Sequence, residues 1–204
     1  MVAEFEPINV LVCGVGGQGT VLASDILCDV ALAEGYDVKK SDSLGMSQRG
    51  GSVVSHVRMG SHVLSPVIPR GEADVLLAFE KLEAARYAPF LKAGGISIVN
   101  DQAIPPLLVS EGRQEYPSDG AVRAILQERT QRQFMVSGEA TALQLGNLRV
   151  LNLVMLGFLS AFLPLSEEAW RGCIPARVPP RFLDLNLVAF AAGRSQAQAE
   201  GSKQ

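Results

Sequence analysis

Residues 8–20 of the chain read INVLVCGVGGQGT, an apolar, β-branched run that ends in a glycine-rich turn. A short apolar run bounded by glycines is typical of a buried strand. Residues 18–34 then carry apolar side chains at helical spacing and end at Gly35, which predicts a helix. A buried strand that enters a helix through glycines indicates an α/β protein with a largely parallel sheet.

The rest of the chain extends this pattern. Further strands are expected at 36–40, 74–79, 96–100 and 133–137, with helices at 80–91 and 118–129 between them. Residues 41–51, SDSLGMSQRGG, predict a loop or a short helix. Residues 52–59 alternate in polarity as a half-exposed strand does, and Gly60 suggests a hairpin that continues to Leu64.

The C-terminal third reads as helical throughout, with helices expected at 139–145, 149–162, 166–173 and 182–193. We therefore expect a three-layer α/β/α fold with a mostly parallel, Rossmann-like mixed sheet and a helical C-terminal third. Residues 1–193 form one expected domain. Residues 194–204, RSQAQAEGSKQ, have almost no apolar content and predict a disordered polar tail.

Composition excludes several classes of function. The chain has 204 residues, and its 18 basic against 21 acidic side chains give a net charge of −3, which disfavours nucleic-acid binding. Its three cysteines show no metal-ligand spacing. The apolar stretch 151–165 is shorter than the roughly 18 residues of a membrane span. With no signal peptide in MVAEFEP, the cytoplasm is the expected compartment.

Hydropathy also predicts a partner surface. Mean hydropathy is +0.20, high for a chain that does not span a membrane. The most apolar helix, 149–162, is the expected location of an exposed apolar patch.

The first motif that could carry chemistry is the glycine turn itself. Glycines allow a tight turn, and amides at a helix N-terminus can hold an anion. Asp42 follows about 20 residues later, as the ribose-binding carboxylate of a dinucleotide site does. Two interpretations stay open, a dinucleotide site and a tight turn that binds nothing. Gln18 among the glycines is unusual for the first.

The second motif is the stretch 45–51, GMSQRGG, in which Ser47, Gln48 and Arg49 offer donors on a pliable backbone. The Arg49 guanidinium could clamp a carboxylate or a phosphate, or pair with a nearby acid. A serine nucleophile elbow is disfavoured because Arg49 stands where that motif needs glycine.

A third group of polar residues lies in the helical third of the chain. Asn147 and Asn152 predict caps or interface contacts, because buried amides must be hydrogen-bonded. Glu139, near a helix start, predicts a partner of the helix dipole.

The chain resembles the gamma-type domain of the pyruvate/ketoisovalerate group of 2-oxoacid:ferredoxin oxidoreductases, and within it the beta subunits of the indolepyruvate type. The resemblance rests on five segments in family order. These are GVGGQGTVLASDIL (14–27), GMSQRGGSVVSHVRMG (45–60), SPVIPRGEADVLLAFEKLEAARY (65–87), GNLRVLNLVMLGFLSA (146–161) and NLVAFAAG (186–193).

The resemblance implies that two subunits of the enzyme have different roles. A larger alpha subunit carries thiamine diphosphate, magnesium and [4Fe–4S] clusters, oxidatively decarboxylates an arylpyruvate or other 2-oxoacid, and passes electrons to ferredoxin. Coenzyme A takes the acyl group. The present chain has neither a thiamine motif nor four clustered cysteines, so no catalytic residue and no metal ligand is assigned to it. Its implied role is to complete the complex and to help seat coenzyme A.

The same resemblance argues against a dinucleotide at the glycine turn, and it points to the coenzyme A pyrophosphate instead. The two glycine-rich loops are expected side by side at the carboxyl end of the sheet. The candidate binding residues are Gly14, Gly16, Gly17, Gln18, Gly19, Thr20, Ser47, Gln48, Arg49, Gly50 and Gly51. Two other classes stay open: a stand-alone NAD(P)-dependent oxidoreductase and a non-enzymatic assembly module.

Overall fold

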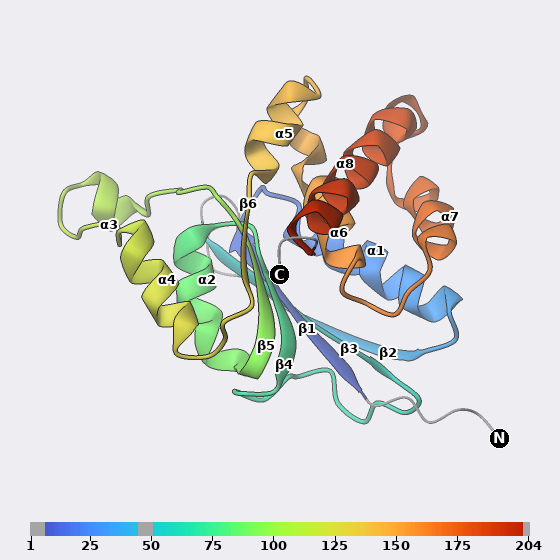
Figure 1. Cartoon of the computed structure of the whole chain (residues 1–204), viewed down its shortest axis with the longest axis horizontal. Helices are drawn as coiled ribbons and strands as arrows, with labels where there is room; N and C mark the ends of the chain where they lie inside the picture. The colour runs from blue at the N-terminus through green and yellow to red at the C-terminus, as the bar shows by residue number, and fades with distance from the viewer. Residues whose placement is uncertain (1–6, 45–50, 202–204) are drawn as a thin grey trace.

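The computed structural model of the chain describes residues 7–44 and 51–201, and it contains a six-stranded sheet in the order β2-β3-β1-β4-β5-β6 (Figure 1). Strands β1, β4, β5 and β6 run parallel, whereas β3 is antiparallel to both β1 and β2. The strands are β1 (Ile8–Val15), β2 (Asp37–Leu44), β3 (Ser52–Gly60), β4 (Ala73–Ala78), β5 (Leu91–Asn100) and β6 (Gln133–Val136).

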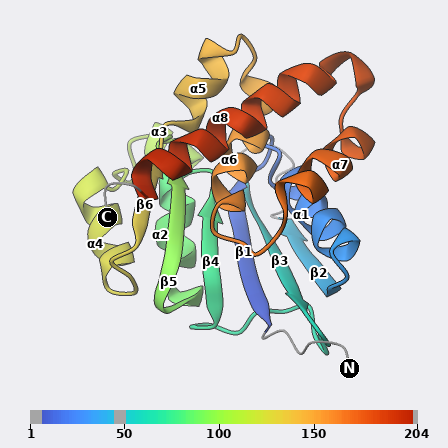
Figure 2. The same ribbon diagram turned by 45° about the vertical axis from the view of Figure 1, so that its right-hand side comes forward.

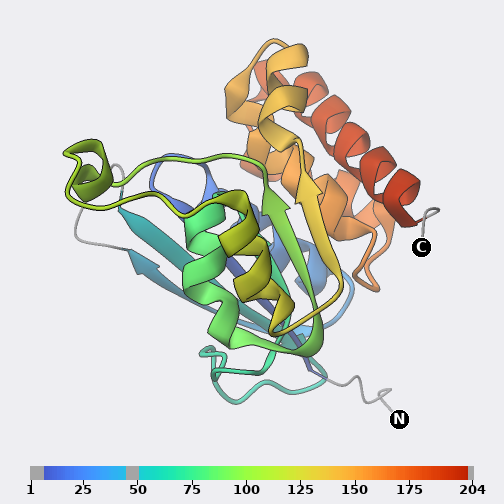
Figure 3. The ribbon, with the colours of Figure 1, turned by 60° about the vertical axis from the view of Figure 1, so that its left-hand side comes forward.

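Helices cover both faces of this sheet. Figure 2 shows α1, α6, α7 and α8 in front of one face, and Figure 3 shows α2 and α4 on the other. This arrangement confirms the predicted three-layer fold and the helical C-terminal third. The α-helices are α1 (Thr20–Ala33), α2 (Lys81–Tyr87), α3 (Leu107–Ser110), α4 (Asp119–Gln127), α5 (Gly138–Gln144), α6 (Leu151–Ser160), α7 (Glu167–Arg177) and α8 (Leu183–Gly201). Single 3₁₀ turns are η1 (Ala88–Phe90), η2 (Leu148–Val150) and η3 (Pro180–Phe182).

Strand β1 shows why the opening run is apolar without alternation. Successive side chains of a strand point to opposite faces of the sheet. Val10 and Val12 enter the core with α1 and α6, whereas Leu11 and Cys13 enter the core with α2 and α4. Both faces of the strand are therefore buried, as the sequence predicts.

The edge of the sheet next to β1 differs from expectation. Strand β2 continues to Leu44, so 41–44 is strand, and β3 pairs with β2 and β1 instead of forming a hairpin with 61–64. The polar residues of β2 hide its strand character, and the Ser55 hydroxyl donates to the Asp42 carboxylate at 2.6 Å. Beyond Gly60, the Val63 amide donates to Asp37 at 2.8 Å, which keeps that segment out of the sheet.

The expected exposure of β3 and of the apolar helix is wrong. Strand β3 is mostly buried, because helices cover both faces of the sheet. All of α6 is buried as well, so it belongs to the core and offers no docking patch. Helix α8 crosses it at two glycines: a Cβ on Gly157 would overlap the carbonyl oxygen of Phe190, and a Cβ on Gly193 would overlap that of Val154. The glycines therefore allow the two helix backbones to touch.

The polar tail is also different from the prediction. Residues 194–201 continue α8, because their polar side chains find partners on neighbouring helices. Arg194 pairs with Glu167 at 3.1 Å and donates to Ser160 at 2.9 Å. Gln196 donates to Thr141 at 2.7 Å. These side-chain hydrogen bonds and the ion pair stabilise the end of α8, where the sequence offers almost no apolar side chains to bury.

Smaller differences concern element ends. Helix α7 runs through Pro175 to Arg177, beyond the expected end at residue 173. Strand β5 begins at Leu91, before the Gly94-Gly95 pair. The long connection between β5 and α4 contains the short helix α3, which stands away from the sheet (Figures 1 and 3).

Candidate functional site

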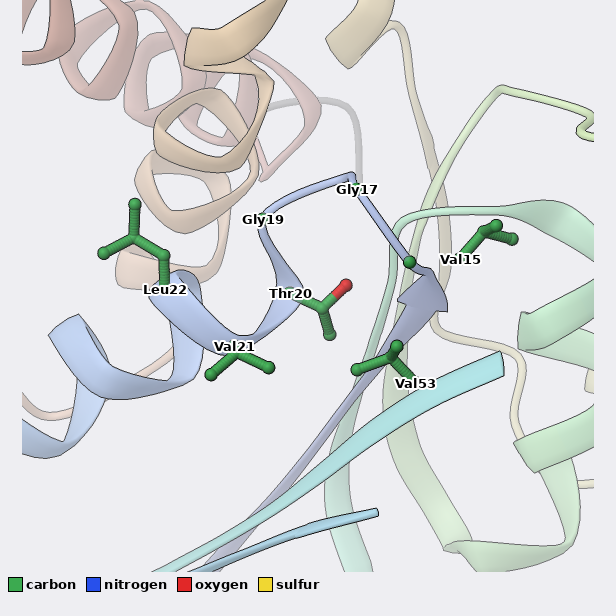
Figure 4. A pocket seen from close by; sticks show the side chains of 8 residues that line it. Val15, Gly17, Gly19, Thr20, Val21, Leu22 and Val53 are labelled. Carbon is green, nitrogen blue, oxygen red and sulfur yellow. The ribbon is translucent and has the colours of Figure 1, made fainter. Parts of the chain in front are cut away.

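The glycine turn lies where β1 ends and α1 begins, at the carboxyl end of the parallel strands (Figure 4). Gly17 and Gly19 have φ angles of 106° and 80°, in the left-handed region that favours glycine. Gly19 is the N-cap residue of α1, and no side chain caps that helix. The first amides of α1 therefore stay available, and together with the helix dipole they favour an anion.

Two glycines of the turn serve different purposes. A Cβ on Gly14 would lie 2.8 Å from the Thr20 hydroxyl and 2.9 Å from Cβ of Phe79, so this glycine is needed for packing. A Cβ on Gly17 would meet nothing within 4 Å. The space above Gly17 is therefore open to a ligand, and only its backbone angle demands glycine.

Gln18 is not the free phosphate donor that the sequence predicts. Its side-chain oxygen accepts from the Val15 amide at 2.7 Å. Its side-chain nitrogen donates to the Phe79 carbonyl at 2.8 Å and to Gln102 at 2.7 Å. Both amide hydrogens are used, so Gln18 fixes the shape of the turn. No spacing in the sequence connects it with Phe79 or Gln102.

The bonds continue beyond Gln18 to α5. The Gln102 amide donates to the Glu139 carboxylate at 2.7 Å, and the Glu139 backbone amide donates to Asn100 at 3.2 Å. Glu139 stands in the first turn of α5, which agrees with its predicted role at a helix start. The end of β5 and the start of α5 are thus tied to the turn.

Thr20, the first residue of α1, brings a buried hydroxyl to the turn. Its side chain is 3% exposed, and its hydroxyl has no hydrogen-bond partner in the described part of the chain. It lines a cavity of about 290 Å³ together with Gly16, Gly17 and Val53. Figure 4 shows the hydroxyl oxygen directed toward the turn between Gly17 and Val15. Buried hydroxyls are normally hydrogen-bonded, so the Thr20 hydroxyl is a candidate donor to a ligand in this cavity.

A second cavity of about 470 Å³ borders the same turn. Arg149 and Asn152 line it, and Arg149 is exposed with no ion-pair partner among residues 7–44 and 51–201. The amide nitrogen of Asn152 would lie 3.1 Å from a Cβ on Gly19. Helix α6 starts here without a side-chain cap. Sequence reasoning missed this juxtaposition, because it depends on the packing of α6 against the turn.

The predicted neighbourhood of the two glycine-rich loops is confirmed at one residue. The Gly16 amide donates to the Gly51 carbonyl at 2.9 Å, so the end of the second loop lies beside the turn. Ser47, Gln48, Arg49 and Gly50 lie outside the described residues. Their part in binding stays a prediction. Asn147 is a cap as predicted, because it accepts from the Arg149 amide at 3.0 Å.

Asp42 does not supply a ribose carboxylate. Strand β3 separates β2 from β1, so Asp42 is not on the strand next to the turn. Its carboxylate accepts from Ser55 and pairs with Lys40 at 3.0 Å. These two contacts hold the carboxylate at the edge of the sheet, away from the turn.

Two buried carboxylates on the other face were not foreseen. Glu80 caps α2 by accepting from the Glu83 amide at 2.9 Å, and it also accepts from the Ile104 amide at 3.0 Å and from the Tyr116 hydroxyl. Burial, followed by the bond to Glu80, raises the pKa of Tyr116. Glu83 accepts from Ser52 and pairs with Arg86. The bonds of Glu80 to Ile104 and Tyr116 hold both ends of the connection that contains α3 against α2.

The described residues offer no group of three metal-ligating side chains. All three cysteines are free. Burial raises the pKa of Cys13 and raises that of Cys28 to about 12, so neither is a thiolate at neutral pH. Among residues 7–44 and 51–201, no helix has the length and apolar character needed to cross a bilayer.

The fold and the site define a Rossmann-like α/β protein with a glycine turn and an uncapped helix start at the carboxyl edge of its sheet. Residues 9–196 match the family described as pyruvate ferredoxin/flavodoxin oxidoreductase, and the chain belongs to this family. It is therefore a subunit of a 2-oxoacid:ferredoxin oxidoreductase, as the resemblance in the sequence implies.

Individual relatives agree with this assignment. The chain is 41% identical over 197 residues to the indolepyruvate oxidoreductase subunit IorB of Thermococcus kodakarensis, covering 95% of this chain and 98% of the relative. The gamma subunit of keto/oxoacid ferredoxin oxidoreductase from Geobacter sulfurreducens has a similar structure, with a TM-score of 0.74, 25% identity, and coverage of 95% and 98%.

A larger enzyme shows the same fold as part of a longer chain. The 2-oxoglutarate:ferredoxin oxidoreductase from Magnetococcus marinus was solved with 2-oxoglutarate, coenzyme A and succinyl-CoA bound. It matches with a TM-score of 0.74 at 22% identity, over 95% of this chain and 31% of that one. None of these relatives supports a stand-alone NAD(P)-dependent enzyme.

Proposed function

We propose that this chain is the smaller subunit of a cytoplasmic, indolepyruvate-type oxidoreductase and that its glycine turn seats the diphosphate of coenzyme A. In such an enzyme an arylpyruvate and coenzyme A give an arylacetyl-CoA, CO₂ and a proton, and two ferredoxins each accept one electron. The 41% identity to IorB supports the arylpyruvate class.

Thiamine diphosphate, magnesium and [4Fe–4S] clusters are assigned to a larger catalytic partner subunit. A [4Fe–4S] cluster takes four cysteine thiolates, and this chain has three scattered cysteines, two of them buried. The residues of this chain therefore do not fit the clusters. They supply binding and orientation, while the partner supplies the redox chemistry.

The observation that carries the coenzyme A assignment is the buried, unpartnered Thr20 hydroxyl beside an uncapped helix start. A diphosphate oxygen in the adjoining cavity would accept from Thr20 and from the first amides of α1. Such charge-assisted bonds are stronger than neutral ones. Gly17 leaves room for the approach, because nothing lies within 4 Å of its would-be side chain. The bound coenzyme A of the Magnetococcus marinus enzyme supports the choice of ligand.

Thr20→Val separates ligand binding from stability. Loss of the hydroxyl should raise the KM for coenzyme A about 3- to 10-fold in the assembled complex, since one hydrogen bond contributes about 0.5–1.5 kcal/mol. The melting temperature should stay level or rise, because a buried unpartnered hydroxyl is removed. Steady-state kinetics with coenzyme A and the 2-oxoacid varied in turn, alongside thermal unfolding, measure both effects.

Thr141→Val is the matched control. The Thr141 hydroxyl is bonded on both sides, to the Ser137 carbonyl at 2.8 Å and to Gln196 at 2.7 Å, and it lies outside the turn. This control should lower the melting temperature and leave the KM for coenzyme A unchanged. An unchanged KM in the Thr20 variant would refute the assignment of the diphosphate to the turn.

A further inference from the structure

The connection between β5 and α4 has no part in the function proposed so far. It spans residues 101–118, whereas a connection from a strand to a helix usually has about 2–6 residues. Connections much longer than this usually serve a function such as binding. Figure 3 shows the segment leaving the carboxyl end of β5 and projecting away from the sheet, with α3 at its tip. We call residues 101–118 the arm.

The base of the arm is fixed to the start of α2. The Glu80 carboxylate is 1% exposed, and it accepts from the Ile104 amide at 3.0 Å and from the Tyr116 hydroxyl. Ile104 lies on the outgoing side of the arm and Tyr116 on the returning side. The Tyr116 oxygen accepts in turn from the Leu82 amide at 3.2 Å. A buried carboxylate is costly without such bonds, so they hold both sides of the arm in place.

The tip of the arm is ordered by its own backbone. The proline pair 105–106 restricts the chain that leads into α3. Helix α3 ends in a Schellman motif, in which the Arg113 amide donates to the Leu108 carbonyl at 2.9 Å and the Gly112 amide to the Val109 carbonyl at 3.0 Å. Gly112 has the positive φ, 71°, that this motif favours. The arm is therefore a preformed element, which loses little entropy when it binds.

The tip presents leucines to solvent. Leu107 is 71% exposed and Leu108 is 43% exposed, and neither belongs to a hydrophobic core of the protein. The arm also contains three carboxylates and one arginine, so it is negatively charged. Exposed apolar side chains on an ordered, acidic element suit a partner surface with an apolar pocket and a basic rim.

The position of the arm indicates which partner this is. The arm starts at the same carboxyl end of the sheet as the turn between β1 and α1 (Figures 1 and 3). The partner's reaction centre must meet the coenzyme A held there, so the larger subunit has to cover this end. In the Magnetococcus marinus enzyme the same fold is 31% of a longer chain, so further protein accompanies it there. A second copy is disfavoured, because the acidic arm would meet a chain with a net charge of −3.

We propose that the arm docks into an apolar pocket with a basic rim on the larger subunit. Leu107 and Leu108 are its contact residues, and Glu80 and Tyr116 are the residues that position it. The proposal rests on the proposed function, because it takes the larger subunit to carry the reaction centre.

Subunit association tests the proposal in the assembled complex. The double variant Leu107→Ser/Leu108→Ser should raise the dissociation constant of the two subunits about 100-fold, because loss of the burial of each leucine weakens binding roughly tenfold. Sedimentation of the complex through a dilution series measures this constant. Both side chains are exposed in the lone chain, so the melting temperature of the lone variant should not change.

Leu64→Ser is the matched control. Leu64 is 87% exposed and lies between β3 and β4, at the opposite end of the sheet from the arm (Figure 1). This control should leave the dissociation constant unchanged. If it weakens association as much as the double variant does, the assignment of the contact to the arm is overturned.

Tyr116→Phe tests the positioning of the arm. It removes the hydroxyl that donates to Glu80 and should raise the dissociation constant about 3- to 10-fold, the effect of losing one hydrogen bond. Added to the double leucine variant, the same change should have no further effect, because no docking remains to be positioned. An equal effect in both backgrounds would overturn the positioning role of Tyr116.

The outcomes separate this proposal from the coenzyme A assignment. If the double leucine variant associates as the parent does, the arm proposal is overturned, whatever Thr20→Val does to the KM for coenzyme A. If association weakens but Thr20→Val leaves that KM unchanged, the turn assignment fails and the arm proposal stands. If the lone chain forms dimers that the double leucine variant dissociates, the occupant is a second copy, and the proposal is overturned.

Discussion

Glycines occur in two regions of this molecule for opposite reasons. At the α6–α8 crossing, Gly157 and Gly193 are glycine because protein backbone fills the space where a side chain would be. At the turn, Gly17 is glycine because of its φ of 106°, and the space around it is empty. Backbone atoms of the protein fill the space in the first region, whereas the space in the second region is open to a ligand. A glycine-rich motif therefore indicates a ligand only where the space beside it is open.

The largest effect should come from filling the packed crossing. In Gly193→Ala the new methyl group overlaps the Val154 carbonyl, so α8 must move off α6. Overpacking of a core typically lowers the free energy of unfolding by about 1–3 kcal/mol and sometimes more. We expect a loss of roughly 3 kcal/mol here, because the new methyl group overlaps backbone atoms, which cannot rotate away. Chemical denaturation measures the loss. A stability within 0.5 kcal/mol of the parent chain would show that the crossing is not tight.

A smaller loss of stability should accompany a change at the open turn. Gly17→Ala places a residue with a side chain in the left-handed region, at a cost of about 1–2 kcal/mol. The same methyl group projects into the proposed ligand space, so the KM for coenzyme A should rise about tenfold. Denaturation and kinetics on one preparation give both values. If stability falls and that KM does not change, the turn has only a structural role, as the α6–α8 crossing does.

The smallest effect should appear at a glycine that has neither constraint. Gly172 lies within α7, and a Cβ there would meet nothing within 4 Å. Its φ is not positive. Gly172→Ala should therefore stabilise the chain by about 0.5–1 kcal/mol, because alanine loses less backbone entropy in a helix. Denaturation against the parent chain checks the sign, and a destabilised variant would mean that exposed space is a poor guide to these glycines.

Sequence reasoning succeeded where local pattern and burial agree. Strand β1 is buried on both faces, and an unbroken apolar run ending in glycines identifies it and the turn. It failed where polar side chains form regular structure through distant partners. Asp42 in β2 is satisfied by Ser55, and Arg194 in α8 by Glu167, and neither pairing leaves a periodic signal in the chain.

The candidate site could be predicted only in part for the same reason. The glycines locate the turn, because their backbone angles are a local property. The functions of Gln18, Thr20 and Arg149 depend on which side chains tertiary packing brings beside them. Gln18 was expected to be a free donor, and its partners Phe79 and Gln102 are 61 and 84 residues away.

The bonds of Gln18 have a thermodynamic consequence. Because its amide is fully engaged with Val15, Phe79 and Gln102, the turn holds its shape through contacts within the protein. A guest at the turn would meet a preorganised backbone, and little conformational entropy would be lost when it binds. Fewer contacts then suffice to orient the guest, because no binding energy is used to order the turn. Coenzyme A would bind as a thiol and leave as a thioester in every turnover, so its site must orient it and still release it.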